Sequence, residues 1–222
     1  MDIAAKIREF RSIVPSGVEI VAVSKFHPAE MIREAYDAGQ RNFGESRVQE
    51  FLEKEKILPR DINWHFIGHL QTNKVKSIIG KTSLIESVDS EKLLNLIDKE
   101  SQNSNIVTNI LLQVHVALEE TKFGFLPSEL IDFFKSQKYK NLKSTRICGL
   151  MGMATNTDRE ERIKKDFIML HSLFREIKNN YEKDLPNFKY LSMGMSGDWH
   201  LAVEEGSNII RIGSAIFGER VY

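Results

Sequence analysis

Apolar residues along this chain gather in short runs, and these runs alternate with longer segments in which apolar residues recur every three or four positions. The short runs are typical of buried β-strands, and the longer segments are typical of amphipathic helices. Eight runs fit the strand pattern, at residues 18–25, 41–45, 64–67, 83–86, 106–116, 144–150, 188–191 and 208–212. In front of the first run, Ile3, Ile7 and Phe10 share one face of a segment that predicts an additional N-terminal helix.

The helical segments carry recognisable ends. Pro28 stands where a first helical residue would lie, and Gly39 falls just past the end of that helix. Pro127 opens a later helix, and Asp89 or Ser90 can cap another. Strands joined through helices pair in parallel, because each crossover needs a helix. Eight such units predict an α/β fold, a single (β/α)8 TIM barrel over residues 1–222, and an open doubly wound sheet is the remaining alternative.

Composition narrows the class of protein. The chain has 31 Lys plus Arg and 31 Asp plus Glu, so its formal net charge is zero. This balance gives no electrostatic reason to expect a nucleic-acid or membrane partner. Cys148 is the single cysteine, which excludes an intrachain disulfide and favours a reducing compartment. No apolar run is long enough for a membrane span or a signal peptide, so we expect a cytoplasmic protein.

The functional groups of a (β/α)8 barrel lie at the carboxyl ends of its strands. Lys25 ends the first predicted strand, directly after the apolar residues Val21, Ala22 and Val23. Partial desolvation by such neighbours favours the neutral amine that a Schiff-base lysine needs. The alternative is a lysine that simply extends into water at the end of a strand.

Two segments rich in glycine and serine follow the last two predicted strands, at residues 191–198 and 211–215. Glycine lets the backbone approach an anion, while serine hydroxyls and main-chain amides donate hydrogen bonds to it. Loops after strands seven and eight often form the phosphate site of such barrels. Arg211 lies beside them at the end of the last strand, where it could face a group held by Lys25. The alternative role for Arg211 is a structural ion pair, for example with Glu45 or Glu86.

Other chemistries find no support in the sequence. The six histidines lack metal-ligand spacing, and no cysteine cluster exists, so no metal site is predicted. The segment around Gly44 and Ser46 does not form the nucleophile elbow of a hydrolase.

The sequence resembles the pyridoxal 5′-phosphate (PLP) homeostasis proteins, a family of PLP-binding barrels. The matching stretches lie in order along almost the whole chain, at residues 21–25, 42–45, 48–50, 64–74, 149–153, 191–196 and 211–218. The resemblance implies a barrel like the N-terminal domain of alanine racemase.

The resemblance also implies roles for individual residues. Lys25 matches the lysine that forms a Schiff base with PLP, and Arg211 matches the arginine that faces the pyridine nitrogen. Asn42 matches a residue near the cofactor ring. The residues matching the phosphate site are Ser196, Gly213 and Ser214. Ser214 stands where many members have threonine, and Phe123 stands where serine is frequent.

These matches lead to a hypothesis of function. An arginine facing the ring keeps the pyridine nitrogen unprotonated and makes PLP a weak electron sink. The barrel pattern fills the sequence and leaves no further domain to supply a second base. We therefore expect a monomeric, non-enzymatic PLP carrier in vitamin B6 and amino-acid homeostasis, with PLP-requiring apo-enzymes as recipients. The alternatives are a low-activity PLP enzyme such as an amino-acid racemase, a cofactor-free Schiff-base aldolase and a pure interaction module.

Overall fold

Strands and helices alternate along the chain in the computed structural model, which describes residues 2–119 and 121–219. The strands are β1 (Glu19–Val23), β2 (Asn42–Glu45), β3 (Asn63–Phe66), β4 (Leu84–Val88), β5 (Thr108–Val114), β6 (Thr145–Gly152), β7 (Tyr190–Met195) and β8 (Ile209–Ile212). The α-helices are α1 (Ile3–Ile13), α2 (Ala29–Asp37), α3 (Val48–Ile57), α4 (Val75–Ile78), α5 (Glu91–Asn103), α6 (Pro127–Lys135), α7 (Glu160–Tyr181), α8 (Trp199–Glu204) and α9 (Ser214–Phe217). Two short 3-10 helices lie at Thr72–Lys74 and Lys138–Asn141.

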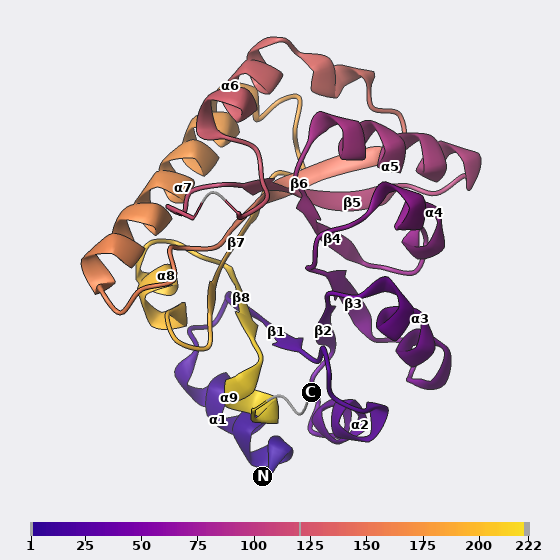
Figure 1. The fold of residues 1–222 in the computed structure, drawn as a ribbon, viewed down its shortest axis with the longest axis vertical. Coiled ribbons are helices and arrows are strands. Elements are labelled where there is room, and N and C mark those ends of the chain that lie inside the picture. Colours follow the sequence, from indigo (N-terminus) through magenta and orange to yellow (C-terminus); the bar gives the residue numbers. More distant parts are fainter. Residues whose placement is uncertain (1, 120, 220–222) are drawn as a thin grey trace.

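The eight strands form one closed parallel barrel in the order β1 to β8, and the helices surround it (Figure 1). β8 closes the ring against β1, with Val21 paired to Arg211 and Ala22 paired to Ile212. The predicted (β/α)8 barrel and its N-terminal helix are therefore confirmed, and the open doubly wound sheet is excluded. Because β1 and β8 are neighbours, the loops that follow them lie side by side at the carboxyl-end mouth.

Apolar side chains form two layers on either side of the barrel wall. A small cluster fills the interior, and its buried members are Val21, Leu84, Leu111, Cys148, Met151 and Ile209. A much larger cluster lies between the strands and the surrounding helices. The predicted face of α1 belongs to this outer layer, since Ile3, Ile7 and Phe10 are all buried there. The outer layer holds the helices in place, and polar side chains lie level with the inner cluster, since Arg211 pairs with Val21 and His65 pairs with Leu84.

The predicted helix ends agree with the structure, except that α2 begins at Ala29 and Pro28 is the residue before it. The Ser90 side chain caps α5 by accepting a hydrogen bond from the Leu93 amide, and Pro127 is the first residue of α6. Gly39 follows the end of α2 with a φ of +96°, a conformation that glycine adopts without steric cost. Among the described residues, no helix is both long and apolar enough to cross a membrane.

Candidate functional site at the carboxyl-end mouth of the barrel

Lys25 lies in the turn after β1, two residues beyond Val23, rather than at the end of the strand as predicted. The backbone is held on both sides of it. The Ser24 hydroxyl donates to Glu45 Oε1 at 2.6 Å, and the Phe26 amide donates to Glu50 Oε1 at 2.6 Å. Phe26 has a φ of +68°, which is uncommon for an aromatic residue and tightens the turn. The half-buried Lys25 side chain therefore starts from a fixed position at the mouth.

Lys54, a buried lysine on α3 that the sequence did not suggest as a functional residue, supports this turn. Lys54 on α3 donates to the Ser24 carbonyl at 2.8 Å, to Glu45 Oε1 at 2.7 Å and to Glu50 Oε1 at 2.6 Å. These three acceptors match the three donors of an ammonium group. Burial raises the pKa of Glu45, against the opposing effect of Lys54. The Glu50–Lys54 spacing of four residues on a helix was a sequence signal for part of this cluster.

Arg211 points into the barrel, because its partner Val21 in the β1–β8 register belongs to the interior cluster. Its Nη1 donates to Ser192 Oγ at 2.5 Å, and its Nη2 donates to the Gly152 carbonyl at 2.9 Å. Glu86 Oε2 lies 3.7 Å from Nη1 and forms an ion pair with it. Of the two alternatives considered for a structural pair, the structure shows Glu86, whereas Glu45 pairs with Lys54.

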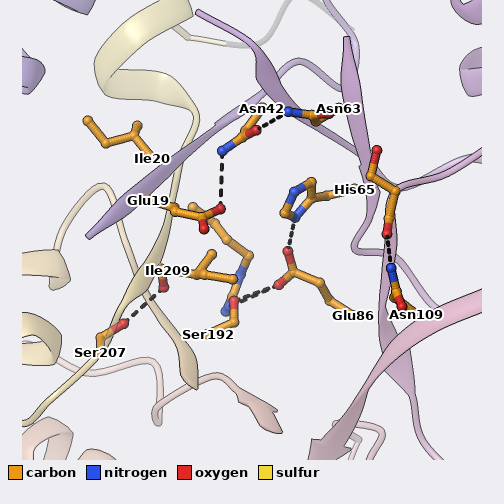
Figure 2. A network of polar contacts seen from close by, with 12 residues as sticks. Glu19, Ile20, Asn42, Asn63, His65, Glu86, Asn109, Ser192, Ser207 and Ile209 are labelled. Atoms are coloured by element: carbon orange, nitrogen blue, oxygen red, sulfur yellow. Dashed lines mark hydrogen bonds and ion pairs between the residues drawn. The ribbon is translucent and has the colours of Figure 1, made fainter. Parts of the chain in front are cut away.

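Glu86 is the centre of a polar network inside the barrel (Figure 2). The Ser192 hydroxyl donates to Glu86 Oε2 at 2.5 Å, and His65 Nδ1 lies 2.6 Å from Glu86 Oε1. Complete burial would raise the pKa of Glu86, but His65, Arg211 and Ser192 together bring that pKa below its ordinary value. Glu86 is therefore an anion, and Arg211 stays protonated because a guanidinium does not lose its proton in proteins.

The two glycine- and serine-rich segments meet as predicted. The Gly213 amide, directly after β8, donates to the hydroxyl of Ser196, directly after β7, at 3.2 Å. Ser214 is exposed and is the first residue of α9. A Cβ atom on Gly213 would lie 3.5 Å from the Val23 side chain, so this turn abuts the end of β1. The turn that carries Lys25 and the turns that carry Ser196, Gly213 and Ser214 therefore share one rim of the barrel.

The structure does not bring Asn42 into this group, so its predicted place beside the cofactor ring stays a prediction that this geometry does not support. It is the first residue of β2, whereas the mouth that holds Lys25 follows the last residue, Glu45. Asn42 donates to Glu19 Oε2 at 3.3 Å and accepts from Asn63 at 3.0 Å. Glu19 and Asn63 are also first residues of their strands. Figure 2 shows these three side chains together at the amino-end mouth.

The described residues contain no group of three or more His, Cys, Asp or Glu side chains suited to hold a metal ion. They do offer complementary contacts for a flat, phosphorylated aldehyde. An amine lies at one rim, hydroxyl and main-chain donors suited to a phosphate lie on the neighbouring turns, and a guanidinium lies deeper in the barrel. The buried ion pair with Glu86 leaves other guanidinium N–H groups of Arg211 for a bound molecule.

Comparisons with known proteins agree with this architecture. The chain matches the family model for the alanine racemase N-terminal domain over residues 2–221. An alanine racemase from Clostridium difficile superposes with a TM-score of 0.75 at 11% identity, and the match covers 98% of this chain and 59% of that one. At such low identity the likeness concerns the fold alone. The fold and the mouth therefore define a barrel of the alanine racemase N-terminal type.

Curated relatives are much more similar in sequence. The chain is 42% identical to the pyridoxal phosphate homeostasis protein of Aquifex aeolicus, over 92% of this chain and 88% of the relative. It is 41% identical to the human protein of that name, over 99% of this chain and 82% of the relative. PipY from Synechococcus elongatus, in its structure without PLP, superposes with a TM-score of 0.91 at 37% identity, and the match covers 97% of this chain and all of that one. The chain belongs to the pyridoxal phosphate homeostasis protein family.

Proposed function

We propose that this protein binds PLP at the carboxyl-end mouth of the barrel and holds it as a Schiff base on Lys25. The observation that carries the proposal is the shared rim of the β1, β7 and β8 turns, which brings Lys25 beside Ser196, Gly213 and Ser214. Family members support it. PipY has been solved with PLP bound, at 36% identity to this chain, and the relatives are named for PLP homeostasis.

Each of these residues has a specific role in binding PLP. Lys25 would hold PLP through an imine between its side-chain nitrogen and the aldehyde carbon, with the aldehyde oxygen released as water. Ser196 and Ser214 hydroxyls and the main chain at Gly213 donate to the phosphate. Arg211 faces the pyridine nitrogen with a positive charge. Bound PLP supplies an electrophilic carbon and an electron-withdrawing ring.

We infer that the role is to store and deliver the cofactor rather than to turn over a substrate. A protonated pyridine ring makes PLP a strong electron sink, and the cation of Arg211 opposes that protonation. The names of the relatives describe homeostasis rather than a reaction. On this proposal, the protein acts as a cytoplasmic monomer, buffers a reactive aldehyde, and passes it to PLP-requiring apo-enzymes in vitamin B6 and amino-acid homeostasis.

A spectrum of the purified protein tests the binding proposal. Wild-type protein mixed with PLP should gain a visible absorption band, and borohydride should fix the cofactor covalently on Lys25. Lys25→Ala should lose both signals, whereas Lys135→Ala, which removes an exposed lysine on α6, should keep them. A band of wild-type strength in Lys25→Ala would overturn the Schiff base.

A second experiment tests the carrier role. PLP-loaded protein should reactivate a PLP-requiring apo-enzyme, and it should not racemise amino acids. Racemisation that disappears in Lys25→Ala would show a PLP enzyme instead.

A further inference from the structure

A row of hydrogen bonds runs through the barrel from Arg211 to the opposite mouth. Arg211 donates to Ser192, Ser192 donates to Glu86, and Glu86 contacts His65. The exposed fraction is 0% for Glu86 and Ser192 and 4% for Arg211 and His65. His65 also lines a cavity of about 300 Å³ at the amino-end mouth, together with Glu19, Asn42 and Tyr190. The row therefore crosses the barrel from the proposed cofactor site to the other end.

We propose that Glu86, acting through Ser192, is a positioning residue that fixes the Arg211 guanidinium toward the cofactor and sets the positive charge that the cofactor ring experiences. This inference rests on the proposed function, because it assigns a task to Arg211 at that site. It names Glu86, Ser192 and His65 as parts of the binding machinery, although none of them lies at the rim.

Geometry supports the assignment. Glu86 is the single carboxylate that forms an ion pair with Arg211 among the described residues, and Asp198 acts on it only from a greater distance. Both oxygens of Glu86 are engaged, one with Ser192 and one with His65. Ser192 Oγ accepts from Arg211 and donates to Glu86, so the hydroxyl fixes the angle of the guanidinium as well as its distance. A second restraint, the Gly152 carbonyl, holds the other terminal nitrogen.

Energetics point to a function beyond stability. A buried ion pair is often no more stabilising than an apolar pair of equal volume, because both charges lose their hydration. Here the network buries four polar side chains beside the apolar interior cluster. The charge of Arg211, partly offset by Glu86, would matter to a bound cofactor. A nearby charge shifts the proton affinity of the cofactor ring and of the Lys25 nitrogen bonded to the cofactor.

The test follows the visible band of the PLP-loaded protein over a pH series. Glu86→Gln keeps the shape of the side chain and removes its charge, so Arg211 remains uncompensated. The stronger positive field should move the midpoint of the absorbance titration to lower pH by about one pH unit or more. Glu86→Asp should lie closer to the wild type, because it restores the carboxylate. Ser192→Ala should shift the midpoint in the same direction by a smaller amount. It removes the hydrogen bonds that link Arg211 to Glu86 without changing a charge.

A double variant distinguishes an effect through Arg211 from a general one. In an Arg211→Gln background, Glu86→Gln should not move the midpoint further. Asp98→Asn is the matched control, because Asp98 is a buried carboxylate on α5 that binds the Lys143 and Ser144 amides away from the barrel interior. It should leave the midpoint unchanged. An unchanged midpoint in folded Glu86→Gln, or an equal shift in the Arg211→Gln background, would overturn the inference.

A measurement without cofactor separates this inference from the proposed function. In the apo-protein, Glu86→Gln and Arg211→Gln should each lower Tm by about 5 °C or more, and the double variant should lose less than the sum. If wild-type protein shows no Lys25-dependent band while this coupling is present, the proposed function fails and Glu86 remains the partner of Arg211. Additive Tm losses would refute the coupling itself.

Discussion

Lys54 Nζ lies 2.7 Å from Glu45 Oε1, and both side chains are buried between β2 and α3. The same ammonium group binds the carbonyl of Ser24, the residue before Lys25. Glu45 Oε2 is also buried and has no hydrogen-bond partner among the described residues. One ion pair on the outer side of the barrel wall thus supports the turn that carries the proposed Schiff-base lysine.

Lys54→Met should destabilise the protein by about 3–5 kcal/mol near neutral pH, because it leaves a buried carboxylate without its counterion. Urea unfolding measures this loss. Lys56→Met, an exposed position on the same helix, is the control and should cost little. If Lys54→Met lowered the free energy of unfolding no more than Lys56→Met, the Lys54–Glu45 ion pair would not stabilise the protein.

The pH dependence of this loss has a definite sign. Burial raises the pKa of Glu45 in the folded protein above its ordinary value of 4.5, so the folded state binds the proton more readily than the unfolded state. Stability therefore falls as pH rises from the ordinary pKa through the raised one. Removing Lys54 removes the contacts that lower the pKa of Glu45. The pH range over which stability falls therefore extends to higher pH. The variant should lose less stability at about pH 5 than at about pH 8.

Gly149 should tolerate no side chain. It has a φ of +153°, and a Cβ atom there would lie 1.8 Å from the Tyr190 carbonyl oxygen on the neighbouring strand β7. Gly149→Ala should therefore destabilise the barrel by about 2–4 kcal/mol in urea unfolding. Gly17→Ala is a matched control, since Gly17 also has a positive φ, +97°, but an added Cβ would meet nothing within 4 Å. It should cost only about 1–2 kcal/mol of backbone strain. Equal losses at both positions would show that the clash is relieved.

The sequence pattern predicted all eight strands and their order, because apolar runs and helical periodicity are local signals. The ends of the strands were predicted less accurately than the strands themselves. Lys25 lies in the turn beyond β1, and Asn42 begins β2, so a residue inside or near an apolar run can belong to either mouth. A four-residue strand such as β2 separates the two mouths by only a few positions, and periodicity does not determine which end carries the site.

The Arg211 network was beyond prediction for a different reason. Glu86 and Ser192 are 106 positions apart, and only barrel closure and strand register bring them together. The sequence suggested Glu86 and Glu45 equally as partners of Arg211. Their side chains differ in the face of the wall that they occupy, since Glu86 points inward to Arg211 and Glu45 points outward to Lys54 on α3. That difference depends on the pleat of each strand, which short apolar runs without alternation do not reveal.

Cys148 should react slowly with thiol reagents in the native state. Its side chain is 4% exposed in the interior cluster, and burial raises the pKa of the thiol, so little reactive thiolate is present. Modification by an aromatic disulfide reagent should follow the rate of unfolding and become fast in concentrated urea. Ser12→Cys, which adds a thiol at an exposed position on α1, should give one additional fast-reacting group. Rapid labelling of the native wild type would indicate that the barrel interior opens.

Ser196 is where the proposed phosphate contacts can be tested without touching Lys25. Its hydroxyl accepts from the Gly213 amide, and phosphate oxygens binding there would replace this contact and accept from both groups. A hydrogen bond to a charged group contributes about 1.5–3 kcal/mol, so Ser196→Ala should raise the Kd for PLP about 10- to 100-fold in absorbance titrations. Ser90→Ala removes a hydroxyl at the start of α5 and should leave the Kd unchanged. Pyridoxal, which lacks the phosphate, should bind wild type and Ser196→Ala with similar affinity if the hydroxyl acts on the phosphate. An equal loss for pyridoxal would instead mean that Ser196 shapes the turn rather than contacts the anion.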